Sequence, residues 1–149
     1  MKLFVPRETT ADETRVAASP ETVKKLAGLG FEVVVESGAG ELSRIPDAQF
    51  EAVGARIGSA SDVVLKVRRP TPAEATACKR GALVLASMDP YGNEADVRAM
   101  GDAGISAFAM EFMPRITRAQ VMDVLSSQAN LAGYQAVVEG AATYVRAVA

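Results

Sequence analysis

The feature of this sequence that most restricts its fold is a series of short apolar runs separated by segments with helical patterns. The runs are nearly continuous in apolar residues, which is typical of strands buried on both faces of a parallel sheet. They predict five strands and one possible short strand at Ala55–Ile57. The five are Lys2–Val5, Phe31–Glu36, Asp62–Val67, Leu83–Ser87 and Ile105–Ala109.

Helix signals lie between these runs. Ser19, followed by Pro20 and Glu21, is typical of a helix start, and Gly30 predicts a left-handed end to that helix. Three more helices fit the later gaps: Asp47–Val53, Thr71–Cys78 and Glu94–Ala103. Short connections between alternating strands and helices predict right-handed crossovers. The expected fold class is therefore α/β, with three layers (α/β/α) around a mostly parallel, doubly wound, flavodoxin-like (Rossmann-like) sheet.

The last third of the chain differs from the rest. Asn130–Ala149 has apolar residues at steps of three and four, which predicts one long amphipathic C-terminal helix with its start at about residue 127. The apolar positions are Leu131, Tyr134, Val138, Ala141, Val145 and Val148. No glycine or polar cap follows them, so we interpret residues 1–149 as one domain whose last helix leads to a further domain. A naturally frayed chain end is the alternative.

Composition excludes several kinds of chemistry. The chain has no histidine, which removes the usual general base, the Ser-His-Asp and Cys-His arrangements and nearly every zinc site not built from several cysteines. Cys78 is the only cysteine, so we expect no internal disulfide, no metal and a reducing compartment. A net charge of −2 argues against a nucleic-acid partner. Without an apolar run near ~20 residues or a signal peptide, the expected location is cytoplasmic.

Charged side chains follow the predicted strands at the sheet edge where ligands bind in open α/β folds. Arg7 and Arg15 come after the first strand, and Lys66 and Arg68 lie at the end of Asp62–Val67. Cations converging on one rim would suit a carboxylate or phosphate ligand. The alternative is that they are solvated or paired with the chain's own acids. Those acids would be Glu8, Glu13 and Asp89.

Two other motifs carry less chemistry. Gly38-Ala39-Gly40 follows a strand like the start of a dinucleotide fingerprint, but the third glycine position is Ser43 and no capped helix follows directly. A turn is the favoured interpretation. Cys78 stands beside Lys79 and Arg80 without a partner thiol or histidine, and we interpret it as inert.

The segment Glu111–Gln128 is long, polar and not clearly periodic, and it joins the last strand to the last helix. Loops on this side of a parallel sheet concentrate function. Arg115 offers a fork of donors, Gln120 an amide, and Asp123 an acid that can hold the arginine. A well-capped helix entry with exposed polar groups is the alternative. A loop that closes over a cofactor is mobile when empty, so we expect high mobility in Met113–Ser126.

Three stretches resemble one enzyme family. Met113–Tyr134 resembles the mobile loop and following helix of the alpha subunit of proton-translocating NAD(P) transhydrogenase. Pro6-Arg7-Glu8 with Glu13–Ala17 and Ser19-Pro20 resembles the amino-terminal signature that these enzymes share with alanine dehydrogenases, and Asp62–Val67 resembles their common third-strand motif. Over essentially its whole length, the chain is similar to the alanine dehydrogenase/transhydrogenase N-terminal domain family.

The resemblance implies that the loop helps direct hydride transfer from NADH to NADP⁺, coupled to proton translocation. Arg115, Gln120, Asp123 and Ser126 would be cofactor-binding residues around the nicotinamide of NAD(H). Gln120, Arg115 and Asp123 would also be the catalytic residues, with Gln120 near the partner nucleotide and Asp123 orienting Arg115. Such a site works by holding donor and acceptor carbons close together, and it needs no acid or base.

The same resemblance implies an assembly. NAD(H) would be bound mainly by an NAD-binding domain of the same subunit that is missing from this chain, and NADP(H) by a separate NADP-binding domain. A membrane domain would carry the protons, and the subunit would form a homodimer. The chain would be cytoplasmic, peripheral to the inner membrane through its partner subunits, and inactive alone.

Two alternative functions follow from the same residues. In alanine dehydrogenases, residues at the positions of Arg15 and Lys66 hold the substrate carboxylate and carbonyl, so these two are possible substrate-cleft residues. A histidine that assists them comes after the strand Leu83–Ser87, where this chain reads Ser87-Met88-Asp89-Pro90. The other alternative is a stand-alone binding or dimerisation module that uses the apolar stripe of the last helix as its interface.

Overall fold

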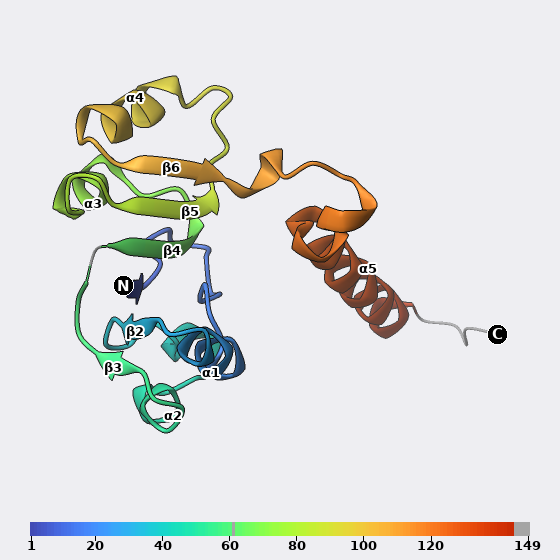
Figure 1. The fold of residues 1–149 in the computed structure, drawn as a ribbon. Helices are drawn as coiled ribbons and strands as arrows, with labels where there is room; N and C mark the ends of the chain where they lie inside the picture. The colour runs from blue at the N-terminus through green and yellow to red at the C-terminus, as the bar shows by residue number, and fades with distance from the viewer. Residues whose placement is uncertain (61, 145–149) are drawn as a thin grey trace. The chain divides into compact units, whose positions relative to one another are not determined.

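The computed structural model describes residues 1–60 and 62–144, and the chain divides into two compact units, Met1–Ala109 and Met110–Ala149. The first unit is built on a six-stranded sheet in the order β3-β2-β1-β4-β5-β6, in which every pair of neighbours is parallel (Figure 1). The strands are β1 (Lys2–Val5), β2 (Glu32–Val35), β3 (Arg56–Ile57), β4 (Val63–Arg68), β5 (Leu83–Ser87) and β6 (Ser106–Ala109). This order is the Rossmann-like form of a doubly wound sheet, which confirms the predicted fold class.

Helices connect these strands close to the predicted positions. They are α1 (Pro20–Gly28), α2 (Asp47–Glu51), α3 (Pro72–Ala77) and α4 (Glu94–Asp102), with a short 3₁₀ turn η1 (Glu41–Ser43) before α2. The Ser19 hydroxyl accepts a hydrogen bond from the Thr22 N–H and so caps α1, and Gly30 follows that helix with a φ of +90°. Local capping and hydrophobic periodicity therefore predicted the boundaries of these strands and helices to within about two residues.

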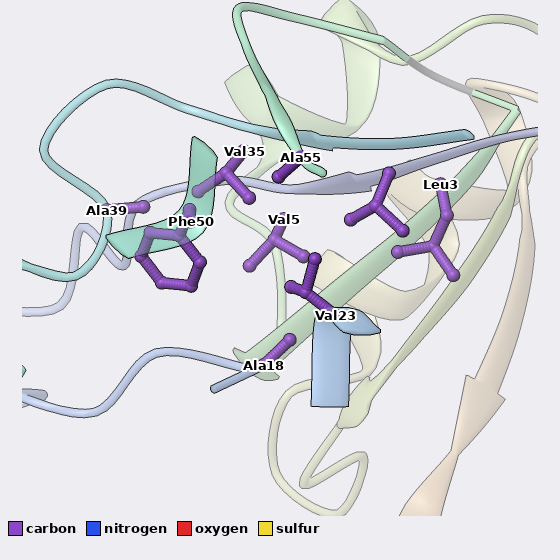
Figure 2. Close-up of a cluster of buried hydrophobic side chains, with 9 residues drawn as sticks. Leu3, Val5, Ala18, Val23, Val35, Ala39, Phe50 and Ala55 are labelled. Atoms are coloured by element: carbon purple, nitrogen blue, oxygen red, sulfur yellow. The ribbon is translucent and has the colours of Figure 1, made fainter. Parts of the chain in front are cut away.

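The helices pack on the two faces of the sheet as two separate clusters. Side chains from β1 and β2 meet α1 and α2 on one face, where Figure 2 shows Phe50 and Val23 beside Val5. On the other face, Val64 and Val84 from β4 and β5 pack with Ala75 of α3 and Met100 of α4. Alternate residues of one strand point to opposite faces, which is why continuous apolar runs are needed here.

The strand β6 departs from the expectation of burial on both faces. It lies at the edge of the sheet, Ser106, Ala107 and Phe108 are exposed, and only Ala109 is partly buried. A continuous apolar run does not show whether a strand lies in the centre of a sheet or at its edge, because the topology of the whole fold decides which strands become its neighbours.

The second unit contains two 3₁₀ segments and one long helix. These are η2 (Met110–Phe112), η3 (Thr117–Met122) and α5 (Val124–Thr143). The predicted start of the last helix at Asn130, or at about residue 127, is wrong: Asp123 caps α5 by accepting a hydrogen bond from the Ser126 N–H at 3.2 Å. The polar residues of this first turn concealed the helical pattern. The helix ends at Thr143, and the predicted continuation over residues 145–149 lies outside the described residues.

The apolar side chains of α5 remain at the surface. Leu131 is 60% exposed and Tyr134 73%, and Val137, which lies outside the predicted stripe, is 72% exposed. Apolar positions thus spread beyond a single stripe, which corrects the amphipathic interpretation of this helix. In the described part of the chain, no helix is both long and apolar enough to cross a membrane.

Candidate functional site

Two groups of polar side chains carry the predicted site residues, one in each unit. In the first unit, the loop after β1 contains Glu13, whose side chain is 4% exposed. Its carboxylate accepts hydrogen bonds from the Arg15 side chain, Nε to Oε1 at 2.6 Å and Nη2 to Oε2 at 2.6 Å, from the Arg15 backbone N–H at 3.1 Å and from Nε of Arg68 at 2.9 Å. The bonds from Arg15 are the largest cause of a lowered pKa for Glu13, which falls from 4.5 to about 2.

Lys66 of β4 belongs to a second ion cluster, which also includes Glu8 from the loop after β1. Its ammonium group, 3% exposed, is 2.8 Å from Oε1 of Glu74 and 3.5 Å from Oε2 of the buried Glu8. Glu8 also accepts a hydrogen bond from the backbone N–H of Val67 at 2.6 Å, where the register of β4 shifts between Leu65 and Arg68. For three of the four cations the pairing with these acids is therefore confirmed, Arg15 and Arg68 with Glu13 and Lys66 with Glu8, and both carboxylates tie the loop after β1 to the end of β4.

Glu74 was missed by sequence reasoning, although a signal for it exists. Thr71-Pro72-Ala73-Glu74 is a capping-box sequence, and the structure shows both of its bonds: Glu74 N–H to Thr71 Oγ1, and Thr71 N–H to Glu74 Oε2. Burial alone would raise the pKa of Glu74, but the hydrogen bonds from Lys66 and Thr71 outweigh burial and lower the pKa. The same carboxylate thus starts α3 and neutralises Lys66.

A cavity of about 580 Å³ opens beside Lys66. Its wall is mostly apolar, with Arg7, Thr9 and Glu74 among its polar residues, whereas Arg15 is absent from the lining. The structure therefore brings Lys66 and Arg7 to one cavity and holds Arg15 elsewhere, on Glu13.

The lone cysteine and the glycine turn have ordinary structural roles. Burial, followed by the nearby charge of Glu74, raises the pKa of the Cys78 thiol, which supports its interpretation as unreactive. Gly38 has a φ of +75°, and its N–H donates to Asp47 Oδ1 at 2.9 Å. A Cβ at Gly40 would clash with the Ile45 carbonyl oxygen. These glycines form a turn whose first N–H already has an acceptor, so the turn interpretation is confirmed.

Sequence reasoning also missed an arginine clamp after β5. Arg69 donates to the backbone carbonyl oxygens of Met88 and Asp89, and its Nη2 lies 3.0 Å from Oδ2 of Asp96 in α4. Asp89 has a φ of +43°, in the left-handed region that is uncommon for non-glycine residues. The clamp therefore holds an unusual turn in the segment Ser87–Pro90.

In the second unit, the predicted loop residues come together around Asp123. Its Oδ2 accepts from Ser126 Oγ at 2.6 Å and from Arg115 Nε at 3.3 Å, and its Oδ1 accepts from the Ser126 N–H. The bonds from Ser126 are the largest cause of a lowered pKa for Asp123. One carboxylate thus starts α5 and fixes the arginine, and no described residue binds the two terminal nitrogens of Arg115, which leaves them available for another group.

A small polar cavity of about 300 Å³ lies at this cluster. It is lined by Arg115, Ile116, Thr117, Gln120, Asp123 and Ser126. All four predicted cofactor-binding residues therefore line one cavity. Its donors and its single carboxylate suit a neutral polar ligand such as an amide, which both donates and accepts hydrogen bonds. No cluster of three or more metal-ligating side chains occurs among residues 1–60 and 62–144.

Comparison with known proteins places this arrangement in a family. Residues 4–132 match the model of the alanine dehydrogenase/PNT N-terminal domain. The chain is 48% identical to the first part of NAD(P) transhydrogenase subunit alpha from Rhodospirillum rubrum, over 99% of its own length and 41% of the relative's. It is 33% identical to alanine dehydrogenase of Mycobacterium tuberculosis, over 95% of its own length and 39% of the relative's.

A solved structure agrees with these relatives. The crystal structure of transhydrogenase from Sinorhizobium meliloti superposes with a TM-score of 0.94 at 58% identity, covering 99% of this chain and 46% of that one. The chain thus spans less than half the length of the relatives that it matches. With the sheet order, the sequence match and this structural neighbour in agreement, the chain belongs to the alanine dehydrogenase/PNT N-terminal domain family.

Proposed function

We propose that this chain is the amino-terminal domain, residues 1–149, of a transhydrogenase alpha subunit, and that its polar cavity helps position NADH for direct hydride transfer to NADP⁺. The observation that carries the proposal is the Arg115–Asp123–Ser126 cluster, in which one carboxylate holds both the arginine and the start of α5. Gln120 lines the same cavity, and its amide has no hydrogen-bond partner in the described part of the chain.

The donor set fits the carboxamide of a nicotinamide. Arg115 presents its terminal N–H groups, and Gln120 presents an amide that can donate and accept. When bound, NADH supplies the hydride and NADP⁺ receives it, so no proton needs to be moved by a side chain. The protein's part is to hold the rings and exclude water, and Asp123 contributes by fixing Arg115 before any ligand arrives.

The remaining assembly is part of the same proposal. An NAD-binding domain of the same subunit would follow α5 and make most of the NAD(H) contacts. A separate NADP-binding domain and a proton-translocating membrane domain would complete the enzyme, with the subunit as a homodimer at the cytoplasmic face of the inner membrane. The relatives' greater length supports further domains beyond this chain.

The test joins this chain to an NAD-binding domain of the family and adds the NADP-binding domain. Hydride transfer from NADH to an NADP⁺ analogue is then measured for the wild type and for Gln120→Asn. We expect the substitution to slow transfer by about tenfold to a hundredfold, because a shorter side chain misplaces the reacting carbons. NADH affinity should remain nearly unchanged, since the Arg115–Asp123–Ser126 cluster is intact.

Gln49→Asn is the matched control, because Gln49 is an exposed residue of α2 outside both cavities. It should transfer hydride at the wild-type rate. If the wild-type protein binds NADH and still transfers no hydride, the proposed function fails. A stand-alone dimerisation module would associate with itself and show no response to either nucleotide.

The alanine-dehydrogenase-like function gains no support from the geometry. Arg15 and Lys66 are both held by carboxylates of the chain itself, and only Lys66 lines the larger cavity. A 2-oxo acid would have to displace Glu13 or Glu74 to reach them. We therefore expect pyruvate to leave the urea unfolding midpoint of the chain unchanged.

A further inference from the structure

The cavity in the second unit has two kinds of polar wall. On one wall, Arg115, Asp123 and Ser126 bind one another, and this wall is already ordered by its own hydrogen bonds. The other wall is the 3₁₀ segment η3, from which Thr117 and Gln120 line the cavity. The second wall makes no side-chain hydrogen bonds with the first within the described residues, so its polar groups remain available.

Thr117 and Gln120 are three residues apart in η3. A 3₁₀ helix has three residues per turn, so side chains at positions i and i+3 lie directly above one another. The hydroxyl of Thr117 and the amide of Gln120 therefore form one polar ridge along the cavity. The spacing that brings Gln120 to the cavity brings Thr117 there too.

The Thr117 hydroxyl has no structural task in the described part of the chain. The residue that precedes η3 is Ile116, and no side chain caps this segment. Thr117 is the first residue of η3 and not its N-cap, so its hydroxyl is not placed to cap the segment. The hydroxyl can donate one hydrogen bond and accept others, so it can bind a ligand group that is either a donor or an acceptor.

We propose that Thr117 is a further binding residue of this site, whose hydroxyl bonds to the same nucleotide that Gln120 approaches and so sets the hydride-transfer geometry. This inference rests on the proposed function. It assigns the ordered wall to the nicotinamide of NADH and the η3 ridge to the partner nucleotide. Loss of the Thr117 hydroxyl should therefore change the rate of transfer and leave NADH affinity unchanged.

The experiment uses the assembled enzyme that contains this chain, with Thr117→Val, which keeps the side-chain shape, and Thr117→Ser, which keeps the hydroxyl. We expect Thr117→Val to slow hydride transfer between bound NADH and bound NADP⁺ by about threefold to tenfold, the effect of one neutral hydrogen bond. Thr117→Ser should stay within about twofold of the wild-type rate, and the Kd for NADH should stay within about twofold in both variants.

Thr76→Val is the control, because Thr76 is exposed on α3 and its hydroxyl bonds only to the Pro72 carbonyl oxygen of its own helix. Its rate should equal that of the wild type. A wild-type rate in Thr117→Val would overturn the inference, as would an equal loss in Thr117→Ser, which would assign the effect to packing. A raised Kd for NADH in Thr117→Val would also overturn it, by placing the hydroxyl on the NADH side.

The two proposals fail in different ways. If the wild-type assembly transfers no hydride, the proposed function is wrong and the role of Thr117 falls with it. If the wild type transfers hydride and Gln120→Asn slows it while Thr117→Val does not, the proposed function stands and only the inference on Thr117 is wrong.

Discussion

Lys66 shows how a single charged residue is kept inside this protein. Its ammonium group is 3% exposed, and an unpaired charge in such a place would cost several kcal/mol. Glu8 and Glu74 offset that cost, and each has a second partner in the backbone, at Val67 and Thr71 respectively. From the sequence, pairing with Glu8 was one of the alternatives, because cations and acids cluster after the strands. The contact with Glu74 depends on how α3 packs beside β4, which spacing along the chain does not show.

Glu13 makes the stability of the first unit depend on pH. Its folded-state pKa of about 2 lies below its ordinary value of 4.5, so the stabilisation is fully present above about pH 4.5 and is lost as the pH falls towards 2. Because Arg15 and Arg68 are about half exposed and screened by water, we expect a contribution of about 2 kcal/mol at pH 7. Urea unfolding of the wild type and Glu13→Gln at pH 7 and pH 3 measures it. The difference between the two proteins should shrink at pH 3, and a constant difference would contradict the assignment.

At the scale of the element, α5 owes its start to the same residue that fixes the candidate site. The Asp123 carboxylate binds the Ser126 N–H at the first turn and Arg115 in the loop. The sequence suggested Asp123 as the partner of Arg115 and gave a well-capped helix entry as the alternative for this segment, and the structure shows Asp123 in both roles. A search for cap residues ahead of polar helix turns would have found this signal.

Two variants separate the roles of Asp123. In Asp123→Ser the hydroxyl can still cap α5, but the partner of Arg115 is gone, whereas Asp123→Ala removes both. We expect both variants to slow hydride transfer in the joined protein. Only Asp123→Ala should speed amide hydrogen exchange in the first turn of α5, because only that variant leaves its N–H groups without an acceptor. Equal exchange in the two variants would show that Asp123 does not cap the helix.

At the scale of the molecule, the two units differ in what they bury. Both core clusters belong to Met1–Ala109, while α5 contains no buried residue. Burial of apolar area is the main source of folding free energy, so nearly all of the stability of this chain should come from the first unit.

A chain that ends at Ala109 should therefore unfold in urea with a stability within about 1 kcal/mol of the full chain, since it keeps both core clusters. Amide exchange on the full chain checks the same point. Residues 113–122 should exchange fast and the amides of β1, β4 and β5 slowly. Loss of cooperative unfolding in the shorter chain would show that the second unit stabilises the sheet.

The sequence by itself determined the fold class, most element boundaries and the loop that carries Arg115, Gln120, Asp123 and Ser126. These follow from local causes, namely hydrophobic periodicity, capping and the residue types in one continuous segment. Only the tertiary structure decided that Glu74 neutralises Lys66, that Arg69 clamps the turn at Asp89, and that β6 is an exposed edge. Each of these depends on which segments become neighbours in space, because ion pairs and burial act over a few ångströms whatever the distance along the chain.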